Sequence, residues 1–332
     1  MVGQLRGVRV AGTGSYLPER VVTNDDLSRT LDTNDEWIVT RTGIKSRHFA
    51  RADEATSDMA LVAAKRAMEA AGVGPADLDL ILCATMTPDH IIPSTAALLQ
   101  RALSAEKAGG YDLQSACSGF VIGLGAGASY VKCGMARNVL VVGAEKMTTV
   151  IDPTDRQTAV IFADGAGAAV LQATSGEPDG PDLLASMAGL QGDDVTLMIP
   201  AGGSRMPITA EVLEKRDNYV KMRGRETFKF AVKTFATLIE ETCRRAGVDP
   251  QDVPVIVPHQ VNQRILEAAA ERVGIPLSRC VINIDHVGNT SGASVGIALD
   301  EAVRTGRLKR GDLVLMLAFG AGLSWASALM RW

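Results

Sequence analysis

One cysteine stands where an α/β chain can activate a nucleophile. Cys117 lies in the segment DLQSACSGF, and the apolar residues from Phe120 to Val131 recur after it at helical spacing. A thiol at a helix N-terminus is stabilised as the thiolate, so we expect a lowered pKa and a sulfur suited to accept an acyl group from a thioester. The alternative is a small buried hydrophobe, the interpretation that fits the remaining cysteines, Cys83, Cys133, Cys243 and Cys280.

A histidine and an asparagine could supply two neutral hydrogen-bond donors. His259 directly follows the apolar run that ends at Pro258, and strand ends are where α/β sheets usually bind ligands. Asn289 lies in the Gly/Ser/Thr-rich segment 288–294. Such a pair could stabilise the enolate that forms when a carboxylate leaves as CO2. The alternatives are a satisfied polar histidine and simple turn chemistry at the asparagine.

The tail after the last long apolar run contains FGAGLSW, residues 319–325. A glycine-rich turn lets backbone amides approach a ligand closely. One of these amides could join the Cys117 N–H in an oxyanion hole, although a tight turn between two central strands explains the spacing equally well.

An internal repeat predicts how these residues come together. Residues 71–82 (AGVGPADLDLIL) match 246–257 (AGVDPQDVPVIV), and the same shift of 175 pairs 138–144 with 313–319. We therefore expect a duplicated α/β domain with its boundary within 174–182, although α/β chains can also carry similar helix–strand units without duplication. The shift places Cys117 opposite Gly292 and Ala84 opposite His259, so the site would lie between the halves.

Composition narrows the class of protein. The 332 residues are 46% hydrophobic and 22% charged, with a net charge of −4, which gives no overall attraction to nucleic acid. Five cysteines without short spacing argue against a disulfide framework or a cysteine-rich metal site and favour a reducing cytoplasm. No signal peptide or membrane span is expected, because the longest uncharged stretch that matters, 113–131, is rich in Gly and Ser. The GLGAGA segment at 123–128 follows no strand, so it does not predict a dinucleotide site. No other motif in the sequence indicates a metal or a flavin site.

Across nearly its whole length the sequence resembles the β-ketoacyl-(acyl-carrier-protein) synthase III family of the thiolase superfamily. The resemblance rests on the Cys117 segment and on five further stretches: 37–44, 164–168, 258–265, 288–291 and the tail to Trp332. It implies a duplicated five-layer αβαβα thiolase-like fold with two mixed sheets related by a pseudo-twofold axis. We expect an N-terminal half over residues 1–178 with the nucleophile, and a C-terminal half over 179–332 with the histidine and asparagine.

The resemblance also implies a Cys117–His259–Asn289 triad and a decarboxylative Claisen condensation. Cys117 would take an acyl group from acyl-CoA, and malonyl-carrier protein would then condense with it at the start of fatty-acid synthesis. The family's second oxyanion amide falls on Ala321 here, with Gly320 as a weaker candidate, although the family has a glycine at this position. Thiolases have a second cysteine near the C-terminal glycine turn, whereas the last cysteine of this sequence is Cys280. Elongating synthases have a histidine at the position of Asn289.

Binding residues are likewise implied by the resemblance. CoA would contact Trp37, Arg41, Arg156, Gly224 and Asn262, and the acyl pocket would end at Ile92. An acidic acyl carrier protein would dock on residues around the histidine loop and one helix: Gln260, Val261, Asn262, Gln263, Arg264 and Lys229. Glu271 and Arg272 replace a pair of lysines found in relatives, which predicts a weaker or shifted basic patch. A homodimer without a permanently bound cofactor is expected.

Two other functions remain open on the sequence. A specialised relative could load the starter of a polyketide or another secondary metabolite. A member that is catalytically silent and serves binding or assembly belongs to a different class, and the joint presence of Cys117, His259 and Asn289 argues against it.

Overall fold

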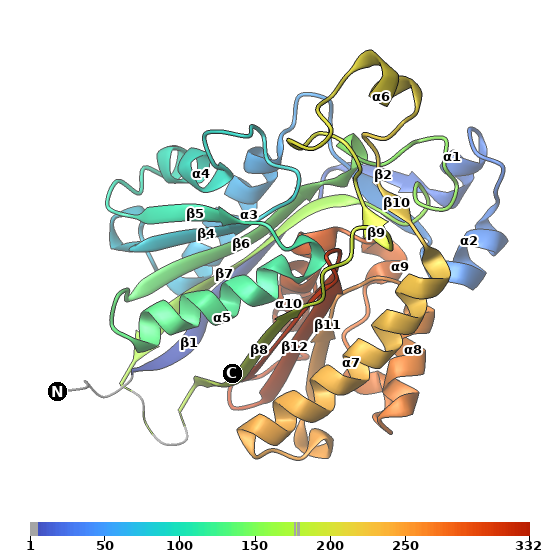
Figure 1. The fold of residues 1–332 in the computed structure, drawn as a ribbon. Coiled ribbons are helices and arrows are strands. Elements are labelled where there is room, and N and C mark those ends of the chain that lie inside the picture. Colours follow the sequence, from blue (N-terminus) through green and yellow to red (C-terminus); the bar gives the residue numbers. More distant parts are fainter. Residues whose placement is uncertain (1–5, 176, 178–179) are drawn as a thin grey trace.

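The computed structural model describes residues 6–175, 177 and 180–332, so the expected boundary at 178/179 lies outside the described residues. Two mixed sheets dominate the fold (Figure 1). The first has the strand order β1 (Gly7–Tyr16), β7 (Asp164–Thr174), β6 (Asn138–Lys146), β4 (Leu80–Ala84) and β5 (Gly109–Leu113). The second has the order β11 (Val255–Pro258), β12 (Leu313–Gly320), β13 (Ser324–Arg331) and β8 (Asp182–Leu190). In both sheets one edge is parallel and the rest antiparallel.

Helices form three further layers. α5 (Gly119–Lys132) and α10 (Ser294–Arg304) lie between the sheets, where Figure 1 shows α5 crossing. α3 (Thr56–Ala71) and α4 (Thr95–Leu103) cover the outer face of the first sheet, and α7 (Gly224–Ala246) with α8 (Gln263–Arg272) covers the second. The expected five-layer αβαβα arrangement is therefore present.

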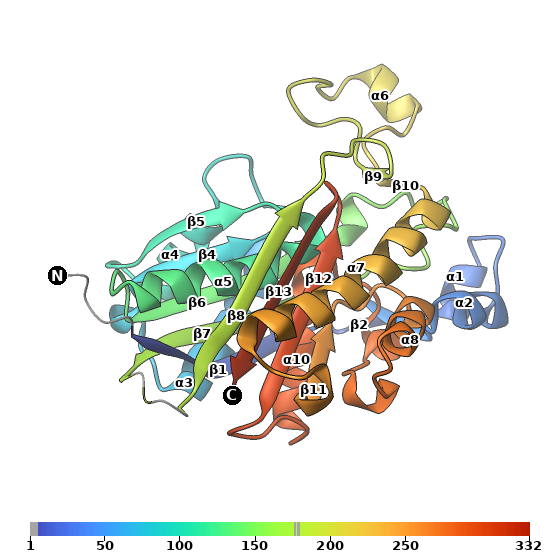
Figure 2. The ribbon, with the colours of Figure 1, turned by 60° about the horizontal axis from the view of Figure 1, so that its bottom comes forward.

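Most of the remaining elements lie at the upper right of Figure 1. They are β2 (Arg20–Thr23), α1 (Asn24–Ser28), α2 (Asp35–Thr42), β3 (Ser46–Phe49), β9 (Leu197–Met198), α6 (Ala210–Glu214), β10 (Lys221–Met222) and α9 (Ile284–Val287). The segment with α6 projects from the body of the molecule (Figure 2). Among the described residues no helix has the length and apolar character needed to cross a bilayer.

The repeat seen in the sequence extends further in the structure. β8, β11, α10 and β12 each begin 175 residues after β1, β4, α5 and β6, and α3 and α7 end at the same interval. The correspondence stops at the following connection. Residues 147–163 join β6 to β7, whereas only 321–323 join β12 to β13. The two halves therefore differ most at one end of the sheets.

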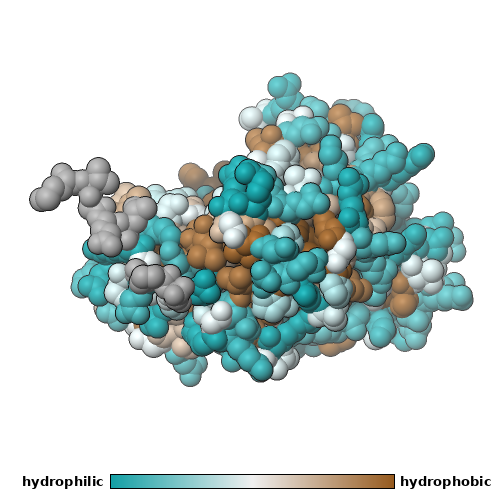
Figure 3. Space-filling model, turned by 90° about the horizontal axis from the view of Figure 1, so that it is seen from below, coloured by the Kyte–Doolittle hydropathy of each residue, from teal (hydrophilic) through white to brown (hydrophobic). Residues whose placement is uncertain are grey.

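Apolar side chains fill each interface between layers. Phe120 and Leu124 of α5 pack with Val295 and Leu299 of α10 between the sheets, and all four are buried. Each such side chain stabilises the fold by about 1.5–3 kcal/mol on burial. Outside the core, the face seen from below is mainly hydrophilic, with hydrophobic residues gathered towards its middle (Figure 3). Cys133 is exposed, so its assignment to the core is wrong; Cys83, Cys243 and Cys280 are buried as expected.

The halves touch backbone to backbone at a pair of glycines. A Cβ atom on Gly143 of β6 would overlap the carbonyl oxygen of Gly292, which lies just before α10. Only a residue without a side chain allows this approach, so the glycine at 143 sets how closely the second half packs on the first.

We expect Gly143→Ala to lower the free energy of unfolding by about 1–3 kcal/mol, because the added methyl forces the halves apart. Gly192→Ala is the matched control, since a Cβ there meets no atom within 4 Å. Urea unfolding followed by circular dichroism measures both. Equal stability of the two variants would contradict the tight contact.

Candidate active site

The three predicted catalytic residues line one cavity at the junction of the halves. Cys117, His259 and Asn289 share it with Phe162, Phe319 and Gly320. Cys117 is 7% exposed, Asn289 3% and His259 1%. The site is therefore shielded from water, and its hydrogen-bond donors act in a medium of low polarity.

Cys117 lies in a single 3₁₀ turn, Ala116–Ser118, that leads directly into α5. The residue before it, Ala116, has φ +45°, and Ser291, 175 residues later, has φ +49°. Neither is a glycine, and left-handed backbone of this kind costs about 1–3 kcal/mol per residue. Both turns thus retain the same strained conformation, and Cys117 Sγ lies 3.5 Å from Ser291 Oγ across the junction.

Our expectation of a lowered thiol pKa is wrong for this site. Burial raises the pKa of Cys117 to about 12, and the hydrogen bond with Ser291 opposes the rise only in part. The helix N-terminus is present, but the loss of water around the sulfur dominates. Cys117 is therefore a thiol at rest and must lose its proton as it reacts.

His259 follows β11, and its backbone N–H donates to Leu317 O on β12 at 2.8 Å. Its ring stacks edge-on against Phe319 with 6.0 Å between centroids, and its Nδ1 has no hydrogen-bond partner. Burial lowers the pKa of His259 to about 3. A neutral imidazole can offer one N–H to an oxygen in the cavity, as stabilisation of an enolate requires.

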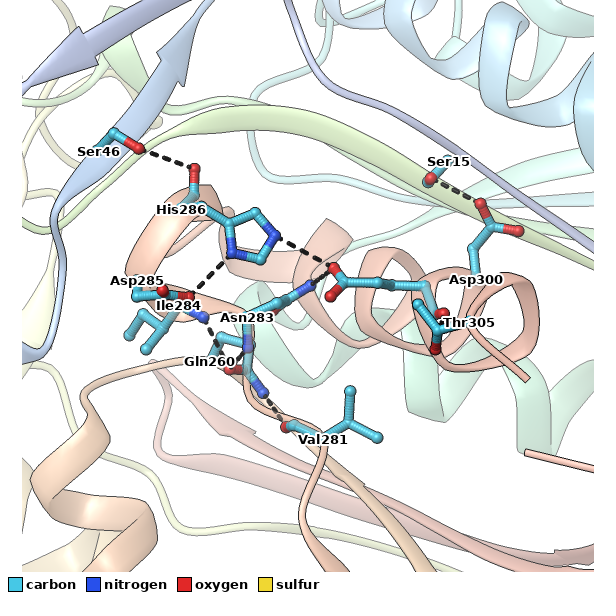
Figure 4. Close-up of polar contacts among 11 residues, drawn as sticks. Ser15, Ser46, Gln260, Val281, Asn283, Ile284, Asp285, His286, Asp300 and Thr305 are labelled. Atoms are coloured by element: carbon cyan, nitrogen blue, oxygen red, sulfur yellow. Dashed lines mark hydrogen bonds and ion pairs between the residues drawn. The ribbon is translucent and has the colours of Figure 1, made fainter. Parts of the chain in front are cut away.

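Gln260 does not lie on the surface, so its expected role in carrier-protein docking is wrong. It is 1% exposed, and its side chain donates to Pro258 O and Val281 O and accepts from the N–H groups of Asn283 and Ile284. Figure 4 shows this contact beside His286 and Asp285. The ring nitrogens of His286 lie 2.9 Å from Asp285 Oδ1 and 3.4 Å from Glu301 Oε2. A buried amide needs such partners, and here they fix the loop that carries His259.

Asn289 is held by strand-like contacts with the first half. Its N–H donates to Ile161 O at 3.0 Å, and its carbonyl accepts from Ala163 N at 2.9 Å. The side-chain Oδ1 accepts from Ser291 N at 2.9 Å. Because the oxygen is occupied within its own loop, the Nδ2 group is left as the donor, which is the role predicted for it.

Two backbone positions, the last residue of β12 and the one after it, border Cys117. Gly320 lines the cavity of the triad, and a Cβ there would lie 2.7 Å from Cys117 N. Ala321 borders a second cavity that also reaches Cys117. The assignment of the second oxyanion amide to Ala321 rather than Gly320 stays a prediction.

The far end of the triad cavity carries the residues predicted to bind CoA. Trp37 lies on α2, whose N-cap Asn34 accepts from the Trp37 N–H. The guanidinium groups of Arg41 and Arg156 lie 4.4 and 5.3 Å from its ring centroid. Gly224 and Asn262 also line this cavity, and Asn262 Nδ2 donates to Arg41 O at 2.7 Å. An aromatic ring with two guanidinium groups close to it suits a planar base attached to phosphates.

The other predicted docking residues lie on α7, on α8 and in the loop before α8. Arg264 and Lys229 are exposed on α8 and α7, while Val261 and Gln263 are partly buried. Val261 lines the triad cavity, and Gln263 donates to Glu267. Arg264 and Lys229 thus offer exposed positive charge to an acidic partner.

Ile92 does not end the acyl pocket of its own chain. It is 84% exposed, next to Ile91 at 92%, and lies on the loop before α4 rather than at either cavity that reaches Cys117.

Sequence reasoning missed three residues of the site. Phe162 comes from the long β6–β7 connection, and Ser291 and Glu145 lie behind the thiol. Glu145 carries a signal that could have been used, since a charge directly follows the buried apolar run of β6. No group of metal-ligating side chains occurs in the part of the chain that the structure describes.

Fold and site together define a class. A buried thiol, imidazole and carboxamide at the junction of a duplicated five-layer α/β fold are the features of a thiolase-like condensing enzyme.

Comparisons identify the family within this class. Residues 111–192 and 243–332 match the models of 3-oxoacyl-[acyl-carrier-protein] synthase III and of its C-terminal part. A β-ketoacyl-[acyl-carrier-protein] synthase III from Caldanaerobacter subterraneus subsp. tengcongensis is 49% identical over 324 residues, 97% of each chain. The 3-oxoacyl-[acyl-carrier-protein] synthase III structure from Aquifex aeolicus is 43% identical, with a TM-score of 0.90, and covers 98% of this chain and 100% of its own. The priming β-ketosynthase of the R1128 polyketide pathway is 38% identical, with a TM-score of 0.90 over 99% and 98%. The chain belongs to the β-ketoacyl-[acyl-carrier-protein] synthase III family, a family of condensing acyltransferases.

The low pKa of His259 predicts a pH dependence of stability. The value is about 3 in the folded chain and 6.5 for a free histidine, so only the unfolded state takes up the proton between these values. Stability is therefore lost as pH falls below about 6.5, at up to about 1.4 kcal/mol per pH unit.

Replacement of this imidazole should remove that contribution. We expect the difference in unfolding free energy between wild type and His259→Asn to change with this slope between pH 6.5 and 5, and to be constant above pH 7. Urea unfolding at several pH values measures it. Parallel curves for the two proteins would show that His259 takes up its proton equally in the folded and unfolded states, and would contradict the lowered pKa.

Proposed function

We propose that the chain joins an acyl-CoA primer to malonyl-acyl carrier protein by decarboxylative Claisen condensation, at the initiation of fatty-acid synthesis. The observation that carries the proposal is one cavity lined by Cys117, His259 and Asn289 and also by Trp37 and Arg41, with Arg156 beside the Trp37 ring. The name shared by the relatives supports the same chemistry.

The first half-reaction acylates Cys117. The sulfur attacks the thioester carbonyl, and the developing oxyanion accepts hydrogen bonds from the Cys117 N–H and from an amide of the turn at Gly320–Ala321. Trp37, Arg41 and Arg156 hold the nucleotide end of CoA, while Gly224 and Asn262 border the path of the pantetheine arm. Oriented donors of this kind contribute roughly 3 kcal/mol each to the transition state.

The second half-reaction extends the primer. After CoA leaves, the malonyl group enters with its thioester carbonyl towards His259 and Asn289. Loss of CO2 leaves an enolate whose oxygen the imidazole N–H and the amide Nδ2 stabilise. The enolate carbon then attacks the acyl-Cys117 carbonyl and expels the Cys117 thiolate, which takes up a proton from water to restore the thiol. Two neutral donors suit this step, because a cation would hold the substrate carboxylate instead of favouring its loss.

The partners follow from the same surfaces. Lys229 on α7 and Arg264 on α8 are exposed and offer positive charge to an acidic carrier protein. Acyl-CoA is a substrate, and no resident cofactor has a role in these steps. A homodimer is supported by β5, an edge strand whose Tyr111 is 40% exposed, and by the exposed Ile91 and Ile92. A second copy would cover this apolar surface.

A second candidate is the loading of a polyketide starter. The observation that favours it is the likeness to the priming ketosynthase of the R1128 pathway. Both functions use the same acyl-Cys117 intermediate, and they differ in primer and in carrier protein. The identity of the fastest primer distinguishes them.

Incubation with a panel of acyl-CoAs should add one acyl group to Cys117. Intact-mass spectrometry followed by peptide mapping detects the adduct. Cys117→Ser should prevent it, whereas Cys133→Ser, which changes an exposed cysteine, should leave it unaltered. Absence of an adduct with every primer would contradict the proposed nucleophile.

Asn289→Ala should retain acylation and slow condensation by about 10²-fold, because one of the two enolate donors is lost. Single-turnover acylation and release of 14CO2 from labelled malonyl-carrier protein measure the two steps separately. Asn138→Ala, at the remote start of β6, is the control and should leave both steps unchanged. Normal decarboxylation by the Asn289 variant would exclude Asn289 from the mechanism.

A further inference from the structure

The condensation steps give no role to the buried carboxylate near the thiol. Glu145 ends the buried part of β6 and is 0% exposed. Its Oε2 accepts from Thr87 Oγ1 at 2.6 Å and from Thr85 Oγ1 at 3.3 Å, and the Met86 N–H donates to both oxygens. Carboxylates are rarely buried in this way, because the charged form loses its hydration.

A single hydroxyl connects this carboxylate to the nucleophile. Ser291 Oγ lies 3.4 Å from Glu145 Oε1 and 3.5 Å from Cys117 Sγ. Ser291 adopts its left-handed backbone with φ +49°, and its N–H is fixed by Asn289 Oδ1. The hydroxyl is therefore held between the two titratable groups by the same loop that carries the catalytic amide.

A purely structural role does not account for a carboxylate at this position. Glutamine would also accept hydrogen bonds from the threonines and from Met86 N. A negative charge behind the sulfur opposes formation of a thiolate, and it contributes to the raised pKa of Cys117. The charge favours the reaction only if it receives the proton that the thiol gives up.

The imidazole is poorly suited to keep that proton. Burial lowers the pKa of His259 to about 3, and its Nδ1 has no partner that would stabilise a cation. Glu145 differs in this respect. Burial raises its pKa to about 7, so it is ionised above neutral pH and can accept a proton near the working pH of an enzyme.

We propose that Glu145 receives the Cys117 proton through the Ser291 hydroxyl while the thiol is acylated. The inference rests on the proposed function. The Cys117 proton passes to Ser291 Oγ as the Ser291 proton passes to Glu145 Oε1, and the Sγ–carbonyl bond forms. The tetrahedral adduct then expels the CoA sulfur, which takes the proton back along the same hydroxyl. The products are acyl-Cys117 and CoA thiol, with Glu145 ionised again.

Among the titratable groups near Glu145, the Cys117 thiol is the one that this path reaches. The thiols of Cys117 and Cys83 are the groups whose pKa values respond to its charge. From the 85–87 turn it receives hydroxyl and amide hydrogen bonds, and the Gly292 N–H also stabilises its charged form. The adjacent Lys146 directs its Nζ to the carbonyls of Arg51 and Glu54.

The pH profile of thiol alkylation tests the link directly. In the wild type we expect the rate with iodoacetamide to rise through about pH 7, as Glu145 ionises, and then to level off. Glu145→Gln should lose this inflection and rise about tenfold per pH unit from 6 to 9. Asp300→Asn removes another buried carboxylate, one that binds Thr13 and Ser15, and should keep the inflection. A Gln variant with the wild-type profile would overturn the proposal.

Ser291→Ala supplies a second test, independent of whether the Gln variant folds. It keeps the carboxylate but removes the connecting hydroxyl, so the inflection should also disappear. Acylation by the fastest primer should slow about 10²-fold in each single variant. The double variant should be no slower than the slower single one, because both changes break one path. Additive losses would show two unconnected effects and overturn the proposal.

The two levels of inference can fail separately. If the wild type accepts no acyl group from any primer, the proposed function fails, while alkylation still reports the coupling of Cys117 to Glu145. If acylation proceeds normally in Glu145→Gln, the proposed function stands and the proton path is excluded.

Discussion

The contact between two equivalent turns is the constraint on which the site depends. Ala116–Ser118 introduces α5 and Ser291–Ala293 introduces α10, and they meet across the junction of the halves. Each turn contains a left-handed non-glycine residue, and Gly292 approaches both Gly143 and Ala116. Strain of this kind persists only where the surrounding packing enforces it. Here the packing of both sheets on the two central helices does so, and it brings the thiol, the amide and the serine together.

Burial then decides the charge state of every group in this contact. It raises the pKa of Cys117 and of Glu145 and lowers the pKa of His259, so each shift favours the neutral form. Apart from Glu145, which is ionised above neutral pH, these groups carry no charge at rest. During the reaction charge appears on a thioester oxygen or an enolate, where fixed donors in a dry cavity stabilise it most. The helix N-terminus at Cys117 acts in this setting on the transition state more than on the resting thiol.

Much of this arrangement could be predicted from the sequence because the chain repeats. The shift of 175 residues paired the segment of Cys117 with that of Gly292 and placed His259 at a strand end, and the structure retains the shift from β1 to β12. Side-chain environment was harder to predict. Gln260 follows His259 and looks like a surface amide in the sequence, yet it is buried by partners at Val281–Ile284 that only the fold brings near. Ile92 is an apolar residue that the sequence places in a pocket, yet it is 84% exposed on the loop before α4. Neither environment leaves a local pattern.

The repeat also explains why a twofold scaffold has one nucleophile. The position equivalent to Cys117 is Gly292, and a Cβ there would lie 3.0 Å from Glu145 Oε1 and 3.2 Å from Ala116 O. A second thiol has no room, since the first turn and the carboxylate occupy that space. The two connections also differ in what they contribute. Residues 147–163 of the first half bring Phe162 to the cavity and Arg156 to the Trp37 ring, while the short 321–323 turn borders the second cavity that reaches Cys117. The first half therefore provides the thiol and part of the cavity, and the second provides the imidazole and the amide. Neither half contains a complete site, so the site depends on the junction.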